Sequence, residues 1–306
     1  MGEVLAVLSG GSGSAKLVRG LRQLGDFTLI VNVGDNYWFH GLYVCPDLDI
    51  LMYELAGLLD RARGWGIRDD TFSALSQLQY YGLETWFRLG DRDLATCLAR
   101  TYLLSRGETL TQVTAKLSGA LGIAQRLLPA SDEYVPTLLD TDQGLLHLQE
   151  FWVKRRGQPR VRRVIYGSEG RPASSEALEA LRRAKAIIIP PANPVTSIAP
   201  ILALSGMAEA MRGKPVVAVS PFRGGEAFSG PAAKLLRELG LEVSPLTLLQ
   251  LYKGLVTHLL IDSSDERLLP ELQSRGIRAW ATDLSMETEQ ASARVAGLCL
   301  QVLGEL

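Results

Sequence analysis

The sequence has little cysteine and little histidine, with three residues of each among 306. The cysteines lie far apart and form neither a CxxC pair nor a paired framework, which is typical of a protein in a reducing compartment. The histidines show no metal-ligand spacing, which argues against a zinc hydrolase and a histidine-based catalytic triad. We therefore expect a cytoplasmic protein whose chemistry rests on other side chains.

The sequence also lacks an excess of charge of one sign and lacks long apolar runs. Its 32 basic and 33 acidic residues leave a net charge of −1, which disfavours a nucleic-acid surface or a polybasic membrane surface. The apolar runs, such as Ala186–Ile189, are far shorter than the ~18 residues that cross a bilayer. No basic segment followed by an apolar one precedes the first motif, so we expect no secretion signal.

What the sequence does contain is an alternation of short β-rich runs and helical patterns. Each run ends in a cluster of small or polar residues, and the six runs are Val4–Leu8, Phe27–Val31, Ala186–Ile189, Pro215–Val219, His258–Ile261 and Ile277–Ala281. This alternation predicts an α/β fold with a doubly wound, mostly parallel, Rossmann-like sheet. Ligands of such sheets bind beyond the carboxyl ends of the strands, where the clusters fall.

The middle of the chain has a different pattern. From Ile50 to about Leu128 the apolar residues recur at helical spacing, and a β-like stretch with a turn at Asp142–Gly144 follows. We predict that residues 51–174 form a mainly helical insertion with a β-hairpin that covers the active-site cleft. Residues 1–50 and 175–306 then form the Rossmann-like nucleotide- and phosphate-binding core.

The first β-rich run leads into a glycine-rich loop, "SGGSGSAKL". It is not a P-loop, because Ala15 rather than glycine precedes Lys16, and it lacks the third glycine of a dinucleotide fingerprint. A run of backbone N–H groups at a helix N-terminus suits an anionic ligand. A plain strand-to-helix turn explains the same letters, and the loop alone does not decide between the two.

A second motif, "CPDLDILMYELAGLLD", places Asp47 and Asp49 in the first turn of a helix that Pro46 opens. Two carboxylates facing the cleft could hold Mg²⁺, which prefers a few carboxylates together with substrate phosphate oxygens. They could equally complement the helix dipole. In "RLGDRDLATCLAR", the pattern favours an ordinary helix that Asp91 caps.

Taken together, the motifs resemble those of the 2-phospho-L-lactate transferases of coenzyme F-420 biosynthesis, over almost the whole chain. Besides the glycine loop, the matching stretches are "NVGDNYWFHGLYVCPDLD", "GWGIRDDTF", "LGDRDLATCLART", "GETLTQVT", "LLPASDEYVPT", "PPANPVTSIAPIL" and "AVSPFRGGEAFSGPAAKL". The sequence departs from the family pattern at Ser12, Ser14, Ala15, Cys97 and Ala192. Hydroxyls survive at positions 12 and 14, so the resemblance still implies phosphate contact there.

The resemblance implies a Mg²⁺-dependent phosphotransferase. Its donor is a phospho-three-carbon acid joined to GMP, and its acceptor is the terminal ribityl hydroxyl of the deazariboflavin Fo. Attack on the phosphorus that bears the three-carbon acid releases GMP. The acid is phospholactate, phosphoenolpyruvate or phosphoglycerate, which this sequence does not distinguish. We expect small-molecule substrates only, and a homodimer on general frequency.

The resemblance also assigns site residues. Those expected to hold the nucleotide and phosphates are Gly10, Gly11, Ser12, Gly13, Ser14, Lys16, Asn193, Ser197 and Ser220. Those expected on the Fo side are Asn32, Asp35, Asp49, Trp65 and Arg88. Asp49 is the expected catalytic residue, which binds Mg²⁺ or orients the attacking hydroxyl, with Asp35 and Asp47 as secondary candidates. Asp49 with Asp47 is the expected magnesium pair. On this assignment Asp49→Asn folds normally and loses most of the transfer activity.

Two other functions fit parts of the sequence. The gluconeogenesis-factor family shares a glycine loop of this type, which implies a nucleotide-sugar-binding regulator without transferase activity. The stretches "GWGIRDDTF" and "LGDRD" in the insertion disfavour it. A nicotinamide-dependent dehydrogenase is a more distant third, because the dinucleotide fingerprint is defective.

Overall fold

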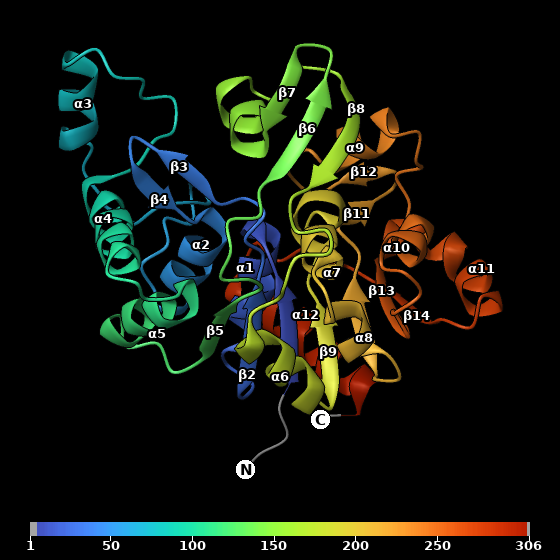
Figure 1. Cartoon of the computed structure of the whole chain (residues 1–306). Helices are drawn as coiled ribbons and strands as arrows, with labels where there is room; N and C mark the ends of the chain where they lie inside the picture. The colour runs from blue at the N-terminus through green and yellow to red at the C-terminus, as the bar shows by residue number, and fades with distance from the viewer. Residues whose placement is uncertain (1–4, 305–306) are drawn as a thin grey trace.

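The computed structural model describes residues 5–304 and contains a seven-stranded, fully parallel central sheet (Figure 1). The strand order is β14-β13-β10-β9-β1-β2-β5. Their bounds are β1 Leu5–Ser9, β2 Phe27–Val31, β5 Arg126–Pro129, β9 Ala186–Ile189, β10 Val216–Val219, β13 His258–Asp262 and β14 Arg278–Thr282. All six expected runs are strands, with Val4 outside the described residues, and the predicted fold class is confirmed.

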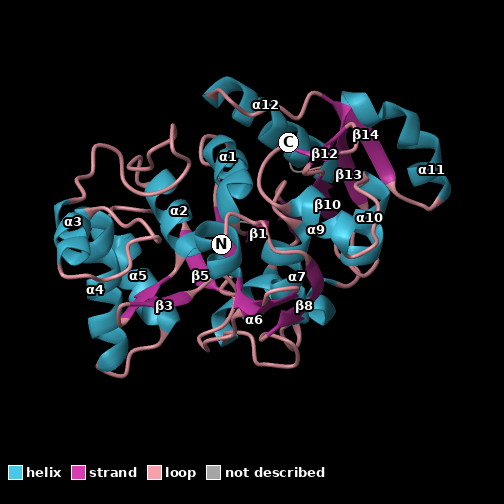
Figure 2. Ribbon diagram, turned by 90° about the horizontal axis from the view of Figure 1, so that it is seen from above, coloured by secondary structure: helices cyan, strands magenta, loops and turns pink. Residues whose placement is uncertain are grey.

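Helices cover both faces of the sheet because its inner strands are apolar on both sides. In β1, Val7 packs with one hydrophobic cluster and Leu8 with the other, and both are fully buried. Figure 2 shows α1 and α12 on one side of the sheet and α6 and α7 on the other. The first cluster includes α1 Gly11–Leu21, α2 Pro46–Leu55 and α12 Glu289–Leu303. The second includes α6 Ser175–Arg183, α7 Ala199–Ala203, α8 Met207–Met211, α9 Ala232–Glu238, α10 Pro245–Leu251 and α11 Leu269–Ser274.

The strand order reverses between β1 and β9, and this reversal positions the site. From β1 the chain moves outward through β2 to β5, whereas from β9 it moves in the opposite direction through β10 and β13 to β14. The loops that follow β1 and β9 therefore separate at the carboxyl edge of the sheet. In a doubly wound sheet this switch point is where ligands bind.

The segment assigned to the insertion leaves the sheet twice. The first excursion begins before residue 51, with β3 Tyr37–Phe39, β4 Leu42–Val44 and the start of α2, and continues through α3 Ser73–Tyr80, α4 Asp91–Ser105 and α5 Leu110–Ala120. The chain then returns as β5, which lies inside residues 51–174 yet forms the edge of the main sheet. The second excursion holds β6 Thr137–Thr141, β7 Gly144–His147, the π-helical turn η1 Glu150–Lys154 and β8 Val161–Tyr166. The expected hairpin is the β6–β7 pair.

Three shorter pieces complete the chain around the cleft. They are the π-helical turn η2 Pro194–Ile198, the hairpin of β11 Phe222–Arg223 with β12 Glu226–Ala227, and the 3₁₀ turn η3 Ser263–Leu268. Within residues 5–304 no helix is both long and apolar enough to cross a bilayer. All three cysteines are buried and free.

Two aspartates cap each other's helices in the first excursion. The carboxylate of Asp70 accepts hydrogen bonds from the backbone N–H groups of Arg92 and Asp93, in the first turn of α4. The carboxylate of Asp91 accepts from Ser73 and Ala74 in the first turn of α3. Asp91 was expected to cap its own helix, so that expectation is wrong. Sequence spacing cannot show a cap that comes from a residue about 20 positions away.

The contact between α1 and α12 gives a test of this packing. A Cβ on Gly20 of α1 would lie 2.2 Å from the carbonyl oxygen of Ser292 in α12. We expect Gly20→Ala to lower the free energy of unfolding by about 1–3 kcal/mol, because the helices must move apart. Gly297→Ala in α12 is the control, since its Cβ would meet only Leu24 at 3.9 Å. This control should gain about 0.5–1 kcal/mol of helix stability. Urea denaturation measures both, and equal midpoints would contradict the packing.

Candidate active site

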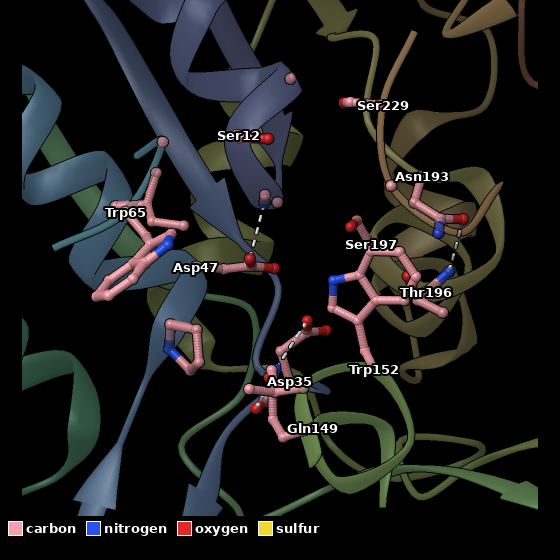
Figure 3. A pocket seen from close by; sticks show the side chains of 18 of the residues that line it. Ser12, Asp35, Asp47, Trp65, Gln149, Trp152, Asn193, Thr196, Ser197 and Ser229 are labelled. Carbon is pink, nitrogen blue, oxygen red and sulfur yellow. Dashed lines mark hydrogen bonds between the residues drawn. The ribbon is translucent and has the colours of Figure 1, made fainter. Parts of the chain in front are cut away.

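A cavity of about 530 Å³ opens at the switch point (Figure 3). The loops after β1 and β9 contribute to it, together with α2, the start of α4, the segment before α3 and η1. Among its lining residues are Gly10, Gly11, Ser12, Gly13, Asp35, Asp47, Asp49, Trp65, Arg88, Asp93, Trp152, Asn193, Thr196 and Ser197. The cavity thus brings together most of the residues that the sequence analysis assigned to a site.

Hydrogen bonds between its own residues hold the glycine loop after β1 in a tight turn. The backbone N–H of Gly10 donates to the Ser14 hydroxyl at 2.9 Å, and that hydroxyl donates to the Gly10 carbonyl at 2.8 Å. Ser14 is fully buried and does not line the cavity, so the structure does not support its expected contact with phosphate. Gly11 has a φ of +70°, which favours glycine, and a Cβ on Gly13 would lie 2.1 Å from the Pro191 carbonyl oxygen. The glycines therefore let the β1 and β9 loops approach.

Asn32, expected on the Fo side, is instead the buried connector of the site. Its amide nitrogen donates to Asp35 Oδ1 at 2.7 Å, Asp47 Oδ2 at 2.9 Å and the Thr196 carbonyl at 3.2 Å. Its amide oxygen accepts from the Gly34 N–H. Every polar atom of the side chain is thereby used, and Asn32 is not among the lining residues. Its task is to hold neighbouring carboxylates in place.

Asp35 and Asp47 are neighbouring carboxyl groups that repel each other when both are ionised. Desolvation raises the pKa of Asp47 to about 6, although bonds from Asn32 and the Gly11 N–H lower it. Desolvation and then the charge of Asp47 raise the pKa of Asp35 well above its usual value. A cation between the two would relieve this repulsion, and hard carboxylate oxygens are the ligands that Mg²⁺ prefers. The donor set therefore fits a magnesium ion at Asp35 and Asp47 better than at the expected Asp49 and Asp47.

Asn193 presents an oriented donor on the opposite wall (Figure 3). Its Oδ1 accepts from the backbone N–H groups of Val195 at 3.0 Å and Thr196 at 3.3 Å. This fixes the amide so that Nδ2, which is buried and bonds to no described residue, is available as a donor. Ser197 lies beside it in the cavity lining. These two residues lie where the sequence analysis expected them.

The Trp65 side of the cavity is aromatic and basic. Trp65 and Trp152 lie on opposite sides of the cavity, with Asp47 and Asp35 between them in the view of Figure 3. The Arg63 guanidinium lies 5.1 Å from the Trp65 ring centroid, and that of Arg88 lies 4.8 Å from the Phe72 ring centroid. Flat aromatic walls with cationic edges suit a planar ring system.

Asp49 lines the cavity but is tied to a partner that sequence reasoning did not single out. Both of its oxygens accept hydrogen bonds from the guanidinium of Arg100, which is 1% exposed. Burial lowers the pKa of Arg100, yet the interactions with Asp49, Cys45 and Cys97 together outweigh this and hold that pKa well above its usual value. Arg100 stands in the family motif "LGDRDLATCLART", which was the available signal. A carboxylate paired with an arginine is a poor magnesium ligand, so the structure does not favour Asp49 in that role.

Asp49, Asp93 and Cys97 have ligand atoms within 4.8 Å of one another. The geometry alone would suit a metal ion. The Arg100 guanidinium, however, already supplies positive charge there and lies 3.9 Å from the Cys97 sulfur. Burial and then the charge of Asp49 raise the pKa of the Cys97 thiol well above its usual value. The cluster thus surrounds a single buried ion pair, Asp49 with Arg100.

Two expected phosphate-binding residues lie elsewhere. Lys16 donates to Glu287 at 2.8 Å, and both side chains are exposed. Ser220 is fully buried, and its hydroxyl accepts from the Phe222 N–H at 3.1 Å. Neither lines the cavity. Both have local structural partners, so their expected contact with the donor is not supported.

With the site described, comparison with known proteins identifies the family. The family model described as "2-phospho-L-lactate transferase CofD" matches residues 5–298. This chain belongs to that family. The resemblance seen in the sequence is therefore confirmed.

Similar proteins match along their full length. A 2-phospho-L-lactate transferase of Methanopyrus kandleri is 43% identical over 99% of this chain and 98% of its own. One of Methanocaldococcus jannaschii is 37% identical over 99% of each chain. A phosphoenolpyruvate transferase of Streptomyces griseus is 38% identical over 99% of each. A solved structure of a UPF0052 family member from Bacillus halodurans has a TM-score of 0.66 at 17% identity, covering 98% of this chain and 99% of that one, and it shows the fold alone.

The ion pair changes what Asp49→Asn is expected to do. Because the variant leaves the buried Arg100 without its counter-charge, we expect it to lose about 3–5 kcal/mol of unfolding free energy as well as activity. The double variant Asp49→Asn with Arg100→Gln should recover most of that stability, since no charge stays unpaired. Urea denaturation at pH 7 measures the unfolding free energies of the wild type, the single variant and the double variant. A single variant as stable as the wild type would contradict the ion pair and restore the expectation drawn from the sequence.

Proposed function

We propose that this chain transfers a phospho-three-carbon-acid group from a GMP-activated diphosphate donor to the ribityl hydroxyl of Fo, releasing GMP. One observation carries the proposal. Six of the eight stretches shared with the family, which are far apart in the sequence, contribute residues to a single cavity at the switch point of the sheet. One end of that cavity suits phosphates and the other suits a planar ring.

The donor would lie between the loops after β1 and β9. Backbone N–H groups from Ser12 and Gly13 at the N-terminus of α1 face anionic oxygens, and the helix dipole favours negative charge there. The Nδ2 of Asn193 adds a donor that is already oriented. Groups fixed before the substrate arrives are the kind that stabilise a phosphoryl-transfer transition state.

Fo would lie at the aromatic end, with its ribityl chain directed along α2 toward the phosphates. Trp65 provides an aromatic wall, Arg88 provides a cationic edge, and Trp152 lies across the cavity from Trp65. The ribityl oxygen then attacks the phosphorus that bears the acid, and the bond to GMP breaks. Positioning of the two substrates in line supplies much of the rate.

We place the magnesium at Asp35 and Asp47. Bound there, it would neutralise non-bridging and leaving oxygens of the diphosphate. The raised pKa values of the two carboxyl groups support this placement, since a cation would stabilise both charged forms. The relatives described above are named as transferases, and no observation favours the nucleotide-sugar-binding regulator.

We also propose a cytoplasmic homodimer. The three buried, free cysteines fit a reducing compartment, and closed twofold dimers are the commonest assembly of soluble enzymes. Light scattering coupled to size-exclusion chromatography would give the mass in solution, and a mass of one chain at assay concentration would contradict the dimer.

The decisive assay is mass spectrometry of the products formed from Fo, Mg²⁺ and each of the three GMP-activated acids. We expect Fo to gain a phospho-acid group as GMP appears in equal amount. Acids that differ by a methyl-sized group should differ in kcat/KM by no more than about 10–200-fold, so all three are run. Unchanged Fo with every donor would contradict the proposal. Fluorescence titration with a nucleotide sugar and NAD would then test the other two functions.

Chelation and Asp35→Asn test the magnesium site together. We expect EDTA to abolish the transfer and added Mg²⁺ to restore it. Asp35→Asn keeps an oxygen for the Asn32 amide but loses a charge, so half-saturating Mg²⁺ should rise at least about tenfold, while melting temperature stays equal or increases. Transfer that is unaffected by the chelator would contradict a metal requirement.

A further inference from the structure

Asp93 lines the cavity and does not cap the helix in whose first turn it lies. It is in the first turn of α4, only 5% exposed, and it lines the cavity beside Asp49. Its Oδ1 accepts a hydrogen bond from the Tyr53 hydroxyl at 2.8 Å. The N-terminus of α4 is already capped by Asp70. The Asp93 carboxyl group is therefore not needed as a cap.

The second oxygen of Asp93 is open toward the cavity. No described residue donates a hydrogen bond to Oδ2, and Asp93 forms no ion pair within residues 5–304. A Cβ on Gly66 would lie 3.8 Å from this oxygen, and Gly66 also lines the cavity. Since glycine carries no side chain, the approach to Oδ2 from the Trp65 end stays free.

Titratable and charged side chains face Asp93 from three parts of the chain. Asp49 and Tyr53 face it from α2, Cys97 and Arg100 from its own helix, and Asp70 from the loop before α3. Arg100 bonds to Asp49 rather than to Asp93. Burial and then the charge of Asp49 raise the pKa of Asp93 to about 7, although the Tyr53 bond lowers it. At neutral pH such a group can both take up and return a proton.

We propose that Asp93 is the general base that accepts the proton of the ribityl hydroxyl of Fo. The inference rests on the proposed function. The O–H bond of the hydroxyl breaks and its proton passes to Asp93 Oδ2. The hydroxyl oxygen forms the new bond to the phosphorus that bears the three-carbon acid. The bond from that phosphorus to GMP breaks, and its electron pair leaves on the GMP phosphate oxygen.

The position of Asp93 suits this task better than that of Asp49. Both Asp49 oxygens accept bonds from Arg100, which weakens Asp49 as a base. On one side of Asp93, Gly66 leads to the aromatic end of the cavity. On its other side lies α2, whose first turn holds Asp47 at the diphosphate end. The ribityl chain of Fo must cross this stretch. Asp49, which Arg100 holds in place, raises the pKa of Asp93 by its charge.

Asp93→Asn is the first test, because asparagine keeps an oxygen for the Tyr53 hydroxyl. We expect kcat to fall about 10²–10⁴-fold, the usual effect of losing a general base. The wild-type kcat/KM should fall as pH decreases through about 7, where Asp93 becomes protonated, and the variant should lose this acidic limb. Asp26→Asn, in the exposed loop before β2, is the matched control and should keep both rate and limb. An Asp93→Asn variant that keeps the wild-type rate and the wild-type acidic limb would overturn the proposal.

Stability and a second variant separate a base from a structural residue. Ionising Asp93 in the folded protein is costly, so Asp93→Asn should melt at an equal or higher temperature than wild type above pH 7. Tyr53→Phe removes the donor that lowers the pKa of Asp93, so the acidic limb should move to higher pH. If the acidic limb of Tyr53→Phe does not move, the proposal is overturned. This test holds even if Asp93→Asn fails to fold. Wild-type protein that forms no product would contradict the proposed function itself, and the inference with it.

Discussion

The buried side-chain amide of Asn32 joins the segments that meet at the carboxyl edge of the sheet. Its nitrogen serves three acceptors, Asp35, Asp47 and the Thr196 carbonyl, although it has only two hydrogens, so the bonds are shared. Asp47 in turn accepts from the Gly11 N–H at 2.7 Å, which links α2 to the glycine loop. The end of β2, the start of α2, η2 and the β1 loop thus have one common connection. The walls of the cavity depend on it for their relative positions.

This connection concentrates negative charge in one place. Asp35, Asp47, Asp49 and Asp93 all line the cavity, and in the described part of the chain only Asp49 has an ion-pair partner. Desolvation raises the pKa of all four, which is a cost to the folded state at neutral pH. Perturbed carboxyl groups of this kind gather at functional sites, where a ligand, a cation or a proton compensates for the cost.

The fold could be predicted because alternating β-rich and helical patterns leave few arrangements. The strand β5 was missed because its four residues at the sheet edge end in Pro129 and carry no clear alternation. Much of the cavity lining could also be predicted, from the glycine loop to Asn193. The pairing of Asp49 with Arg100 spans 51 residues and is fixed only by tertiary packing. The burial of the Ser14 and Ser220 hydroxyls could not be predicted either, because no motif reveals their local hydrogen bonds to Gly10 and Phe222.

The central claim is that one cavity at the switch point holds both substrates, with the diphosphate at the glycine loop and the deazaflavin ring at the insertion. A crystal structure of the protein with Fo and GDP bound tests it most directly. The account predicts the GDP phosphates between the loops after β1 and β9, and the Fo ring near Trp65 with its ribityl chain passing Asp93. Fo bound at the amino-terminal edge of the sheet, or GDP phosphates away from Gly11–Gly13, would contradict it.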